Sequence, residues 1–343
     1  MNTLPRRTFL KSSAIGASSL LAAPFIKASP QSKPLRMAVI GISGRCWAHY
    51  DWLLQEEVVA LCDVDTAALT NIRDTYRQRG ILPAKESFPK AKFYTDYREL
   101  FESQDDFDAI LICTPDVHHY PAVMRALRAG KAIYCEKPLT FTAWEAQQIA
   151  QETAKLKLPT QMGNQGMSTL GWRQAHAYYH GDAIGEVTEV HTWMDFDQAA
   201  EKAARTKPTQ ENGDPLPKTV DWDIWAGPAP KPIYKDGYFH PGNWRYWIDY
   251  GCGRFGDFAC HTNNAMYKVL EPGYPTHVEV LTQSHFNGDS FPAQRVLKWQ
   301  FPKRGDRAAF DAYWYDGGLR PPRPKQLEAT REERNRLLEE VLV

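Results

Sequence analysis

An acid and a base lie four residues apart in the second half of the chain, within GCGRFGDFACHTNN. Asp257 and His261 fall on one face of the helix that this segment predicts, and the apolar side chains between Phe255 and Val269 form a separate stripe. Histidine titrates near neutral pH, and a neighbouring carboxylate can orient its ring, so the pair suits proton transfer. The alternative is a hydrogen-bonded pair that only stabilises a core.

A lysine in the first half could act beside this pair. Lys137 belongs to Glu136-Lys137-Pro138, which follows the short apolar run AIYC. At the carboxyl end of a strand, its ammonium group could donate to a substrate oxygen and stabilise negative charge there. A solvated loop lysine with no such role is the alternative.

The segments around Lys137 predict a parallel sheet. Four short apolar runs occur in PLRMAVIG, VVALCDVD, FDAILICTPD and AIYCEKPL, and helix-like stretches over 66–80, 120–130 and 144–156 alternate with them. Strands that alternate with helices give a doubly wound sheet covered on both faces, the Rossmann arrangement.

The turn after the first run predicts a dinucleotide site. It reads Gly41-Ile42-Ser43-Gly44-Arg45-Cys46, in which Ser43 and Cys46 replace two of the three glycines of G-x-G-x-x-G. Asp63 ends the next run, where a carboxylate accepts hydrogen bonds from the ribose of NAD and repels the 2′-phosphate of NADP. NAD is therefore the expected cofactor, although a helix-capping role for Asp63 is the alternative.

Together these motifs resemble the glucose–fructose oxidoreductase, inositol dehydrogenase and MocA (Gfo/Idh/MocA) family over residues 35–320. The resemblance rests on AVIG-x-x-G-R, Cys113-Thr114-Pro115-Asp116, Glu136-Lys137-Pro138 and Asp257-x-x-x-His261. It implies an N-terminal Rossmann domain and a C-terminal α+β domain with an open, mostly antiparallel sheet. The implied catalytic residues are Lys137, Asp257 and His261. The implied cofactor contacts are Gly41, Ser43, Gly44, Arg45, Asp63, Thr114, Pro115, Asp116, His118, Glu136 and Lys137.

The second half carries the expected substrate contacts. Strand-like segments occur in EVTEVHTWMDF, THVEVLTQSHF, AQRVLKWQFP and AAFDAYWYD. Aromatic residues cluster over 222–250; most are expected to pack a loop, and His240 and Asn243 are polar neighbours that could bind sugar hydroxyls. The residues singled out for substrate are Asn164, Gln165, Arg173, Arg245 and Asn264. No metal site is expected.

The ends of the chain carry two further predictions. Residues 1–30 have a basic start with Arg6-Arg7, a short apolar stretch and small residues near Ala28, and they resemble a twin-arginine export signal, which implies a periplasmic or otherwise exported protein. The expected domains are then 34–158, which binds NAD, 159–325, which binds substrate and forms oligomers, and a charged C-terminal helix, 326–343. Relatives continue with further strands at that point, so the second sheet is either incomplete or covered by this helix.

Composition excludes some partners. The 41 basic and 41 acidic residues cancel, which argues against nucleic acid, and no segment after the signal is apolar and long enough to span a membrane. Of the 6 cysteines, Cys62, Cys113 and Cys135 end or follow strand-like runs, and all six are expected to be free thiols. A homo-oligomer through the C-terminal sheet is expected from the resemblance.

Three functions remain open. The first is an NAD-dependent oxidoreductase that acts on CH–OH groups of a sugar, glycoside or cyclic polyol. The second is a glycosidase that oxidises its sugar transiently and returns the hydride. The third is a non-catalytic sugar-binding protein that retains NAD.

Overall fold

The computed structural model describes residues 33–104, 106–194 and 205–323. The expected signal at 1–30 and the expected C-terminal helix at 326–343 lie outside these ranges. No helix within the described ranges is long and apolar enough to cross a membrane.

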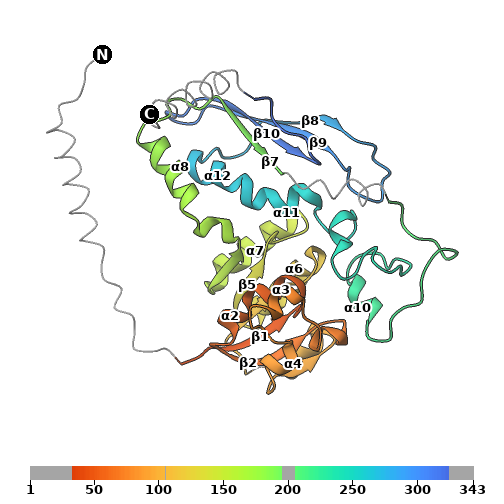
Figure 1. Ribbon diagram of the computed structural model, residues 1–343. Helices are drawn as coiled ribbons and strands as arrows, with labels where there is room; N and C mark the ends of the chain where they lie inside the picture. The colour runs from red at the N-terminus through yellow and green to blue at the C-terminus, as the bar shows by residue number, and fades with distance from the viewer. Residues whose placement is uncertain (1–32, 105, 195–204, 324–343) are drawn as a thin grey trace, which may run out of the picture. The chain divides into compact units, whose positions relative to one another are not determined.

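The first half is a six-stranded parallel sheet in the order β3-β2-β1-β4-β5-β6 (Figure 1). Its strands are β1 (Arg36–Ile40), β2 (Glu57–Cys62), β3 (Lys92–Tyr94), β4 (Ala109–Ile112), β5 (Ala132–Glu136) and β6 (Thr160–Gly163). The order reverses between β1 and β4, and in such sheets ligands bind at the carboxyl ends of the strands where the order reverses. The four expected strands are present, and the sheet continues to Gly163 through β6.

Helices cover both faces of this sheet because its strands are apolar on both sides. Ala38 and Ile40 of β1 pack in one core cluster, and Met37 and Val39 pack in another on the opposite face. The helices are α2 (Tyr50–Leu53), α3 (Asp74–Arg77), α4 (Ala84–Ser87), α5 (Tyr97–Ser103), α6 (His119–Arg128) and α7 (Ala143–Leu156), together with the 3₁₀ helices η1 (Gly44–His49), η2 (Thr66–Leu69) and η3 (Asp116–His118).

The single helix expected over 66–80 does not form. The chain instead has η2 and the separate short helix α3, with residues 70–73 outside both. Thr70 closes η2 and Arg73 has extended backbone angles. Thr70, Asn71 and Ile72 are weak helix formers, which agrees with the break at this point.

The second half is a four-stranded sheet with helices on one face. Its order is β7-β10-β9-β8, in which only β7 and β10 run parallel. The strands are β7 (Glu189–Trp193), β8 (His277–Gln283), β9 (Arg295–Phe301) and β10 (Phe310–Asp316), as the four strand-like segments predicted. The remaining elements are η4 (Gln165–Ser168), α8 (Leu170–His180), α10 (Trp222–Ala226), η6 (Asn243–Tyr246), α11 (Gly253–Thr262) and α12 (Asn264–Leu270).

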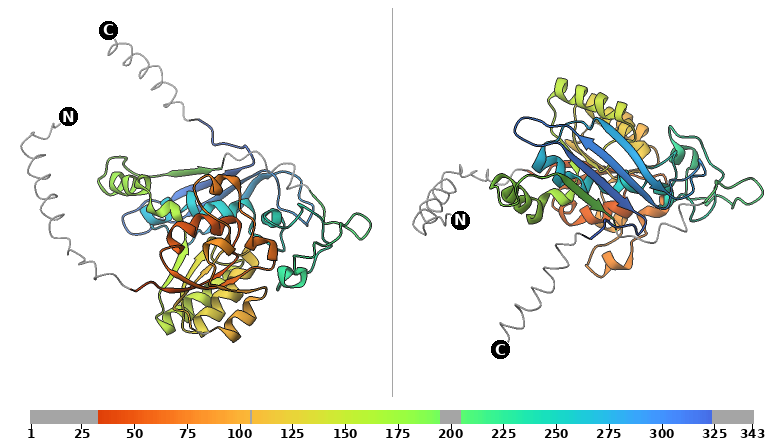
Figure 2. Two further views of the ribbon diagram at one scale, coloured as in Figure 1. Left: turned by 60° about the horizontal axis from the view of Figure 1, so that its bottom comes forward. Right: turned by 90° about the horizontal axis from the view of Figure 1, so that it is seen from above.

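The helix that carries Asp257 and His261 lies between the two sheets (Figure 1). α12 packs Met266, Val269 and Leu270 against Phe301 and Phe310 of the second sheet. Seen from above, the other face of this sheet lies toward the viewer, with no helix of the described ranges over it (Figure 2). The expected single helix over 255–269 is in fact α11 and α12, which meet at Asn263.

Candidate active site

A glycine turn joins β1 to η1 at the carboxyl edge of the first sheet. Gly41 has φ +78°, and a side chain there would place its Cβ 2.8 Å from the carbonyl carbon and oxygen of Cys113. Only glycine allows this approach. Gly44 has φ +59° with no heavy atom near the position of a Cβ. Cys46, one of the residues that replace a motif glycine, is fully buried in the core.

Asp63 ties this turn to the end of β2. Its Oδ2 accepts a hydrogen bond from the Ile42 amide at 3.0 Å, and its Oδ1 accepts one from the Asp65 amide at 3.1 Å. Burial raises the pKa of Asp63 to about 6, and the two amide bonds oppose that shift. The carboxylate is therefore mostly charged at neutral pH and lines the cleft described next.

A cleft of about 670 Å³ lies along this edge of the sheet. Eight of the eleven expected cofactor contacts line it, namely Gly41, Ser43, Gly44, Arg45, Asp63, Thr114, Pro115 and His118. Asp116, Glu136 and Lys137 are not among its lining residues.

Three buried polar atoms on the cleft wall have no partner among the described residues. They are Nε1 of Trp47, Oγ1 of Thr114 and Nδ1 of His118, whose Nε2 contacts the Trp225 carbonyl oxygen at 2.8 Å. A buried polar atom without a hydrogen bond is costly, so a polar ligand would stabilise this wall. The glycine turn, Asp63 and these three atoms together fit NAD.

The second half closes the outer wall of the cleft. Val220 forms an antiparallel bridge with Asp65, and the amides of Thr66 and Asp221 each donate a 2.9 Å hydrogen bond across this junction, to Thr219 and Val64. His240 reaches Asp65 Oδ2 at 3.1 Å. We call residues 217–221 with His240 the strap. His240, expected among sugar-binding groups, instead lies at the nucleotide cleft.

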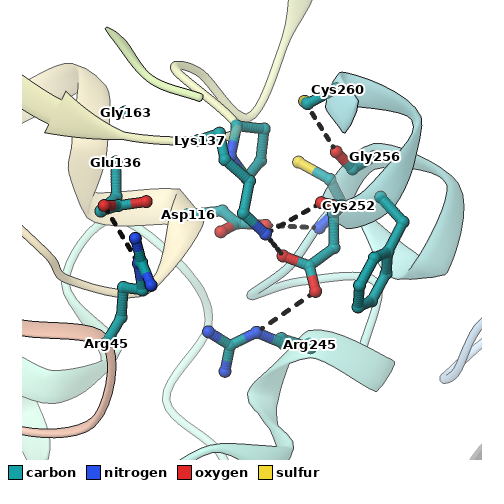
Figure 3. A network of polar contacts seen from close by, with 12 residues as sticks. Arg45, Asp116, Glu136, Lys137, Gly163, Arg245, Cys252, Gly256 and Cys260 are labelled. Carbon is teal, nitrogen blue, oxygen red and sulfur yellow. Dashed lines mark hydrogen bonds and ion pairs between the residues drawn. The ribbon is translucent and has the colours of Figure 1, made fainter. Parts of the chain in front are cut away.

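Lys137 and Asp257 form a buried pair where the two halves meet (Figure 3). Lys137 Nζ donates to Asp257 Oδ1 at 2.5 Å and to the Asp257 carbonyl oxygen at 2.9 Å. Arg245, which lines the end of the cleft, lies 3.5 Å from Asp257 Oδ2. Gly251 permits this approach, since a Cβ there would lie 2.8 Å from the Arg245 Cα.

His261 is half-buried on the same helix. Burial lowers its pKa, and the positive charge of Lys137 lowers it further. The ring is thus neutral at neutral pH, the state a general base requires. Asp257 was expected to orient this ring, but its carboxylate bonds to Lys137, and no hydrogen bond joins His261 to any described residue.

Glu136 lies in a buried network beside Lys137. Its Oε1 contacts His49 Nε2 at 2.6 Å, Gln165 Nε2 at 3.0 Å and Arg45 Nε at 3.1 Å. Burial alone would raise the pKa of Glu136, but the His49 bond and the Arg45 charge outweigh it and lower that pKa. The Trp52 indole nitrogen lies 3.0 Å from His49 Nδ1. Burial would lower the pKa of His49, but its contacts with Cys113 and Glu136 raise that pKa to about 9.

Asp116 joins the first half to the start of α11. Its Oδ2 accepts from the Cys252 amide at 2.9 Å. Burial raises the pKa of Asp116 to about 7, and the negative charge of Asp257 adds to the rise. This carboxyl thus supports the helix that carries Asp257 rather than lining the nucleotide cleft.

The five residues expected to contact substrate do not lie together in the structure. Gln165 and Arg245 reach Glu136 and Asp257, and Asn164 donates to the Cys260 carbonyl oxygen, one residue before His261. Asn164 and Asn264 line a second cavity of about 410 Å³ with Phe255, Met266 and Trp299. Arg173 is exposed on α8 and lines neither cavity.

Sequence reasoning missed several residues of the site. His49 and the strap carry no local motif, and Trp47, Arg73 and Tyr76 line the cleft from segments without a recognisable signal. The aromatic cluster is mostly packing, as expected, because Trp222, Trp225, Phe239, Trp244, Trp247 and Tyr250 share one buried core. All six cysteines are free, as expected.

Two family models match the chain and cover both halves. Residues 35–164 match the oxidoreductase family with the NAD-binding Rossmann fold, and residues 191–302 match the C-terminal alpha/beta domain of that family. The chain belongs to the Gfo/Idh/MocA oxidoreductase family. Its first half is an NAD-binding Rossmann domain.

Two curated relatives of this chain carry the names of glycosidases. The chain is 33% identical over 140 residues to a glycosyl hydrolase family 109 protein of Stenotrophomonas maltophilia, which covers 40% of this chain and 30% of that protein. It is 29% identical over 152 residues to an alpha-N-acetylgalactosaminidase of Shewanella oneidensis, with 41% and 31% covered. The chain thus spans less than half the length of the curated relatives it matches.

A solved structure shares the fold. The WlbA dehydrogenase of Bordetella pertussis, in complex with NADH and UDP-GlcNAcA, superimposes with a TM-score of 0.58 at 13% identity, covering 86% of this chain and 72% of that one.

Proposed function

We propose that this protein is an NAD-dependent enzyme that oxidises a hydroxyl group of a sugar, glycoside or cyclic polyol. The observation that carries the proposal is the Lys137–Asp257 pair, whose carboxylate is on the same helix as the imidazole of His261 and is joined through Arg245 to a cleft that fits NAD. The names of the relatives support a carbohydrate substrate.

Each of these residues has its own role in the proposed reaction. Lys137 uses two of its three N–H donors on Asp257, which leaves one for a substrate oxygen. Its charge stabilises the alkoxide that develops as the hydroxyl proton leaves. Asp257 holds the ammonium group in place, and Arg245 holds Asp257 from the other side. His261, neutral and without a hydrogen bond to the described residues, accepts the hydroxyl proton.

The glycine turn and Asp63 would hold NAD, and the strap borders the same cleft. The chemistry that bound NAD would supply is hydride acceptance from a carbon that carries a hydroxyl group. Glu136 and its network fix the end of β5, from which Lys137 follows directly in the chain.

The experiment is a substrate panel read by two signals. Purified protein with NAD is offered free sugars, polyols and aryl glycosides, and absorbance of the reduced cofactor and release of the aryl group are recorded together. Net reduction of NAD with a sugar or polyol supports the oxidoreductase. If no member of the panel changes either signal, while sugar binding is measurable by calorimetry, the protein is a non-catalytic sugar binder and the proposal is wrong.

A second candidate is redox-neutral glycoside cleavage, favoured by the strap. In this reaction a sugar is oxidised transiently, the glycosidic substituent is eliminated, water adds in its place, and the hydride is returned. Such a cycle needs a cofactor that stays bound, and two backbone bonds with the Asp65–His240 contact close the cleft from outside. Aryl release without net reduction of NAD would identify this reaction.

We also propose that the protein is exported through the twin-arginine route and forms a homo-oligomer through the second sheet. Arg6-Arg7 and the apolar stretch after them support export. Cell fractionation with Arg6→Lys/Arg7→Lys as the control variant tests this, and sedimentation tests the oligomer.

A further inference from the structure

His119 begins α6 and contacts the loop that follows Lys137. The residue is 1% exposed. Its Nδ1 is 2.6 Å from the Pro138 carbonyl oxygen, and its Nε2 is 3.0 Å from the Thr114 carbonyl oxygen. The ring therefore bridges the loop after β5 to the loop after β4.

Both partners of this ring are acceptors. A carbonyl oxygen has no proton to give, and a neutral imidazole has only one N–H. Burial lowers the pKa of His119, although the two carbonyl groups oppose that change, so the neutral ring prevails near neutral pH. The single proton belongs on Nδ1, because the Pro138 contact is the shorter one.

The Pro138 carbonyl is one residue from the catalytic lysine. Proline fixes its own φ, so a bond to its carbonyl oxygen also restricts the backbone of Lys137. Lys137 in turn must reach Asp257 at 2.5 Å from across the junction of the two halves. A shift of this loop would weaken that contact, because a hydrogen bond loses strength as its length and angle change.

We propose that His119 is a positioning residue that holds Lys137 against Asp257 through the Nδ1–H bond to the Pro138 carbonyl oxygen. It touches neither substrate nor cofactor in this assignment. The proposal rests on the proposed function only for its effect on turnover, since the position of Lys137 can be measured without any reaction.

The test uses variants that keep one nitrogen each. In His119→Asn the amide nitrogen takes the place of Nδ1, and in His119→Gln it takes the place of Nε2. Amine acetylation of the NAD-free full chain, followed by peptide mass spectrometry, reports how well Asp257 protects Lys137. Lys155, whose side chain is 72% exposed, serves as the internal reference in every sample.

The expected result separates the two variants. In His119→Gln the labelling rate of Lys137 rises about fivefold or more relative to Lys155, because local opening exposes the amine, and in His119→Asn it stays within about twofold of wild type. On any substrate found in the panel, kcat falls in the Gln variant with KM and NAD affinity little changed. Equal labelling in both variants overturns the proposal.

A measurement on the unchanged protein covers the case in which neither variant folds. Nitrogen-15 NMR of histidine-labelled protein assigns the proton of each buried ring, and a neutral His119 protonated on Nε2 would overturn the proposal. If labelling and tautomer agree with the proposal while no sugar is turned over, the positioning role stands and the proposed function fails.

Discussion

Removing Asp257 alone should cost more stability than removing Lys137 and Asp257 together. Both side chains are almost buried, with 12% and 9% of their surfaces exposed. Asp257→Asn leaves the Lys137 ammonium without a carboxylate partner among the described residues, and stranding a buried charge costs about 3–5 kcal/mol. Lys137→Met should cost less, because Arg245 remains 3.5 Å from Asp257.

The double variant should therefore be more stable than the sum of the single losses predicts. We expect a coupling energy of about 2–3 kcal/mol, the upper part of the range for residues in direct contact. The assay is urea unfolding of the four proteins without NAD, with the slopes compared to check two-state behaviour. The catalytic rate of Lys137→Met should also fall by about 10²–10³, as for loss of one oxyanion donor.

A matched control comes from an exposed pair in the same chain. Arg79 and Asp51 are 2.7 Å apart, with 54% and 60% of their side chains exposed. Their cycle should give less than about 1 kcal/mol, because solvent screens the charges. If the Lys137–Asp257 coupling is no larger than this control, the two groups are not paired in solution and the site geometry is wrong.

Three further predictions test other parts of the site. Gly41→Ala should lower NAD affinity and stability, because the added Cβ would press on the Cys113 carbonyl group. Gly80→Ala, with φ +82° and open space around it, is the control and should show only the backbone cost of about 1–2 kcal/mol in stability. Calorimetry measures NAD affinity and urea unfolding measures stability, and equal losses of stability in the two variants would contradict the close approach at Gly41. NAD should bind at least about tenfold more tightly than NADP, a difference of about 1.4 kcal/mol in binding free energy. Asp63→Ala should reduce this difference between the two affinities. Equal affinities for NAD and NADP in the wild-type protein would show that Asp63 does not select the cofactor. Because the folded-state pKa of Asp116 is raised to about 7, its folded form holds a proton that the unfolded chain has released, so its contribution to stability falls as pH rises from about 4 to about 7. Asp116→Asn should flatten that part of the stability–pH curve, and an unchanged curve would contradict the raised pKa.

The sequence determined the elements and the chemical types of the site. Apolar runs and their spacing predicted four strands of the first sheet and all four of the second, because burial on one or two faces leaves a local pattern in the chain. Gly41 and Asp63 were recognisable because each follows a strand at a fixed place in a dinucleotide turn. Spacing marked Asp257 and His261 as an acid and a base on one helix face, and the resemblance to a family joined Lys137 to them as a catalytic group.

Tertiary structure alone decided which of these groups pair. Asp257 and His261 share a helix face, yet the carboxylate bonds to Lys137, 120 residues away in sequence, because the two halves pack along α11. The strap and His49 depend on contacts between residues up to 175 positions apart, for which no periodicity exists. His119 shows the same limit: two adjacent histidines stand in the sequence, and only the packing of two loops gives one of them the Pro138 carbonyl oxygen as its partner. Hydrogen bonds of this kind depend on distance in the folded chain, which local sequence does not encode.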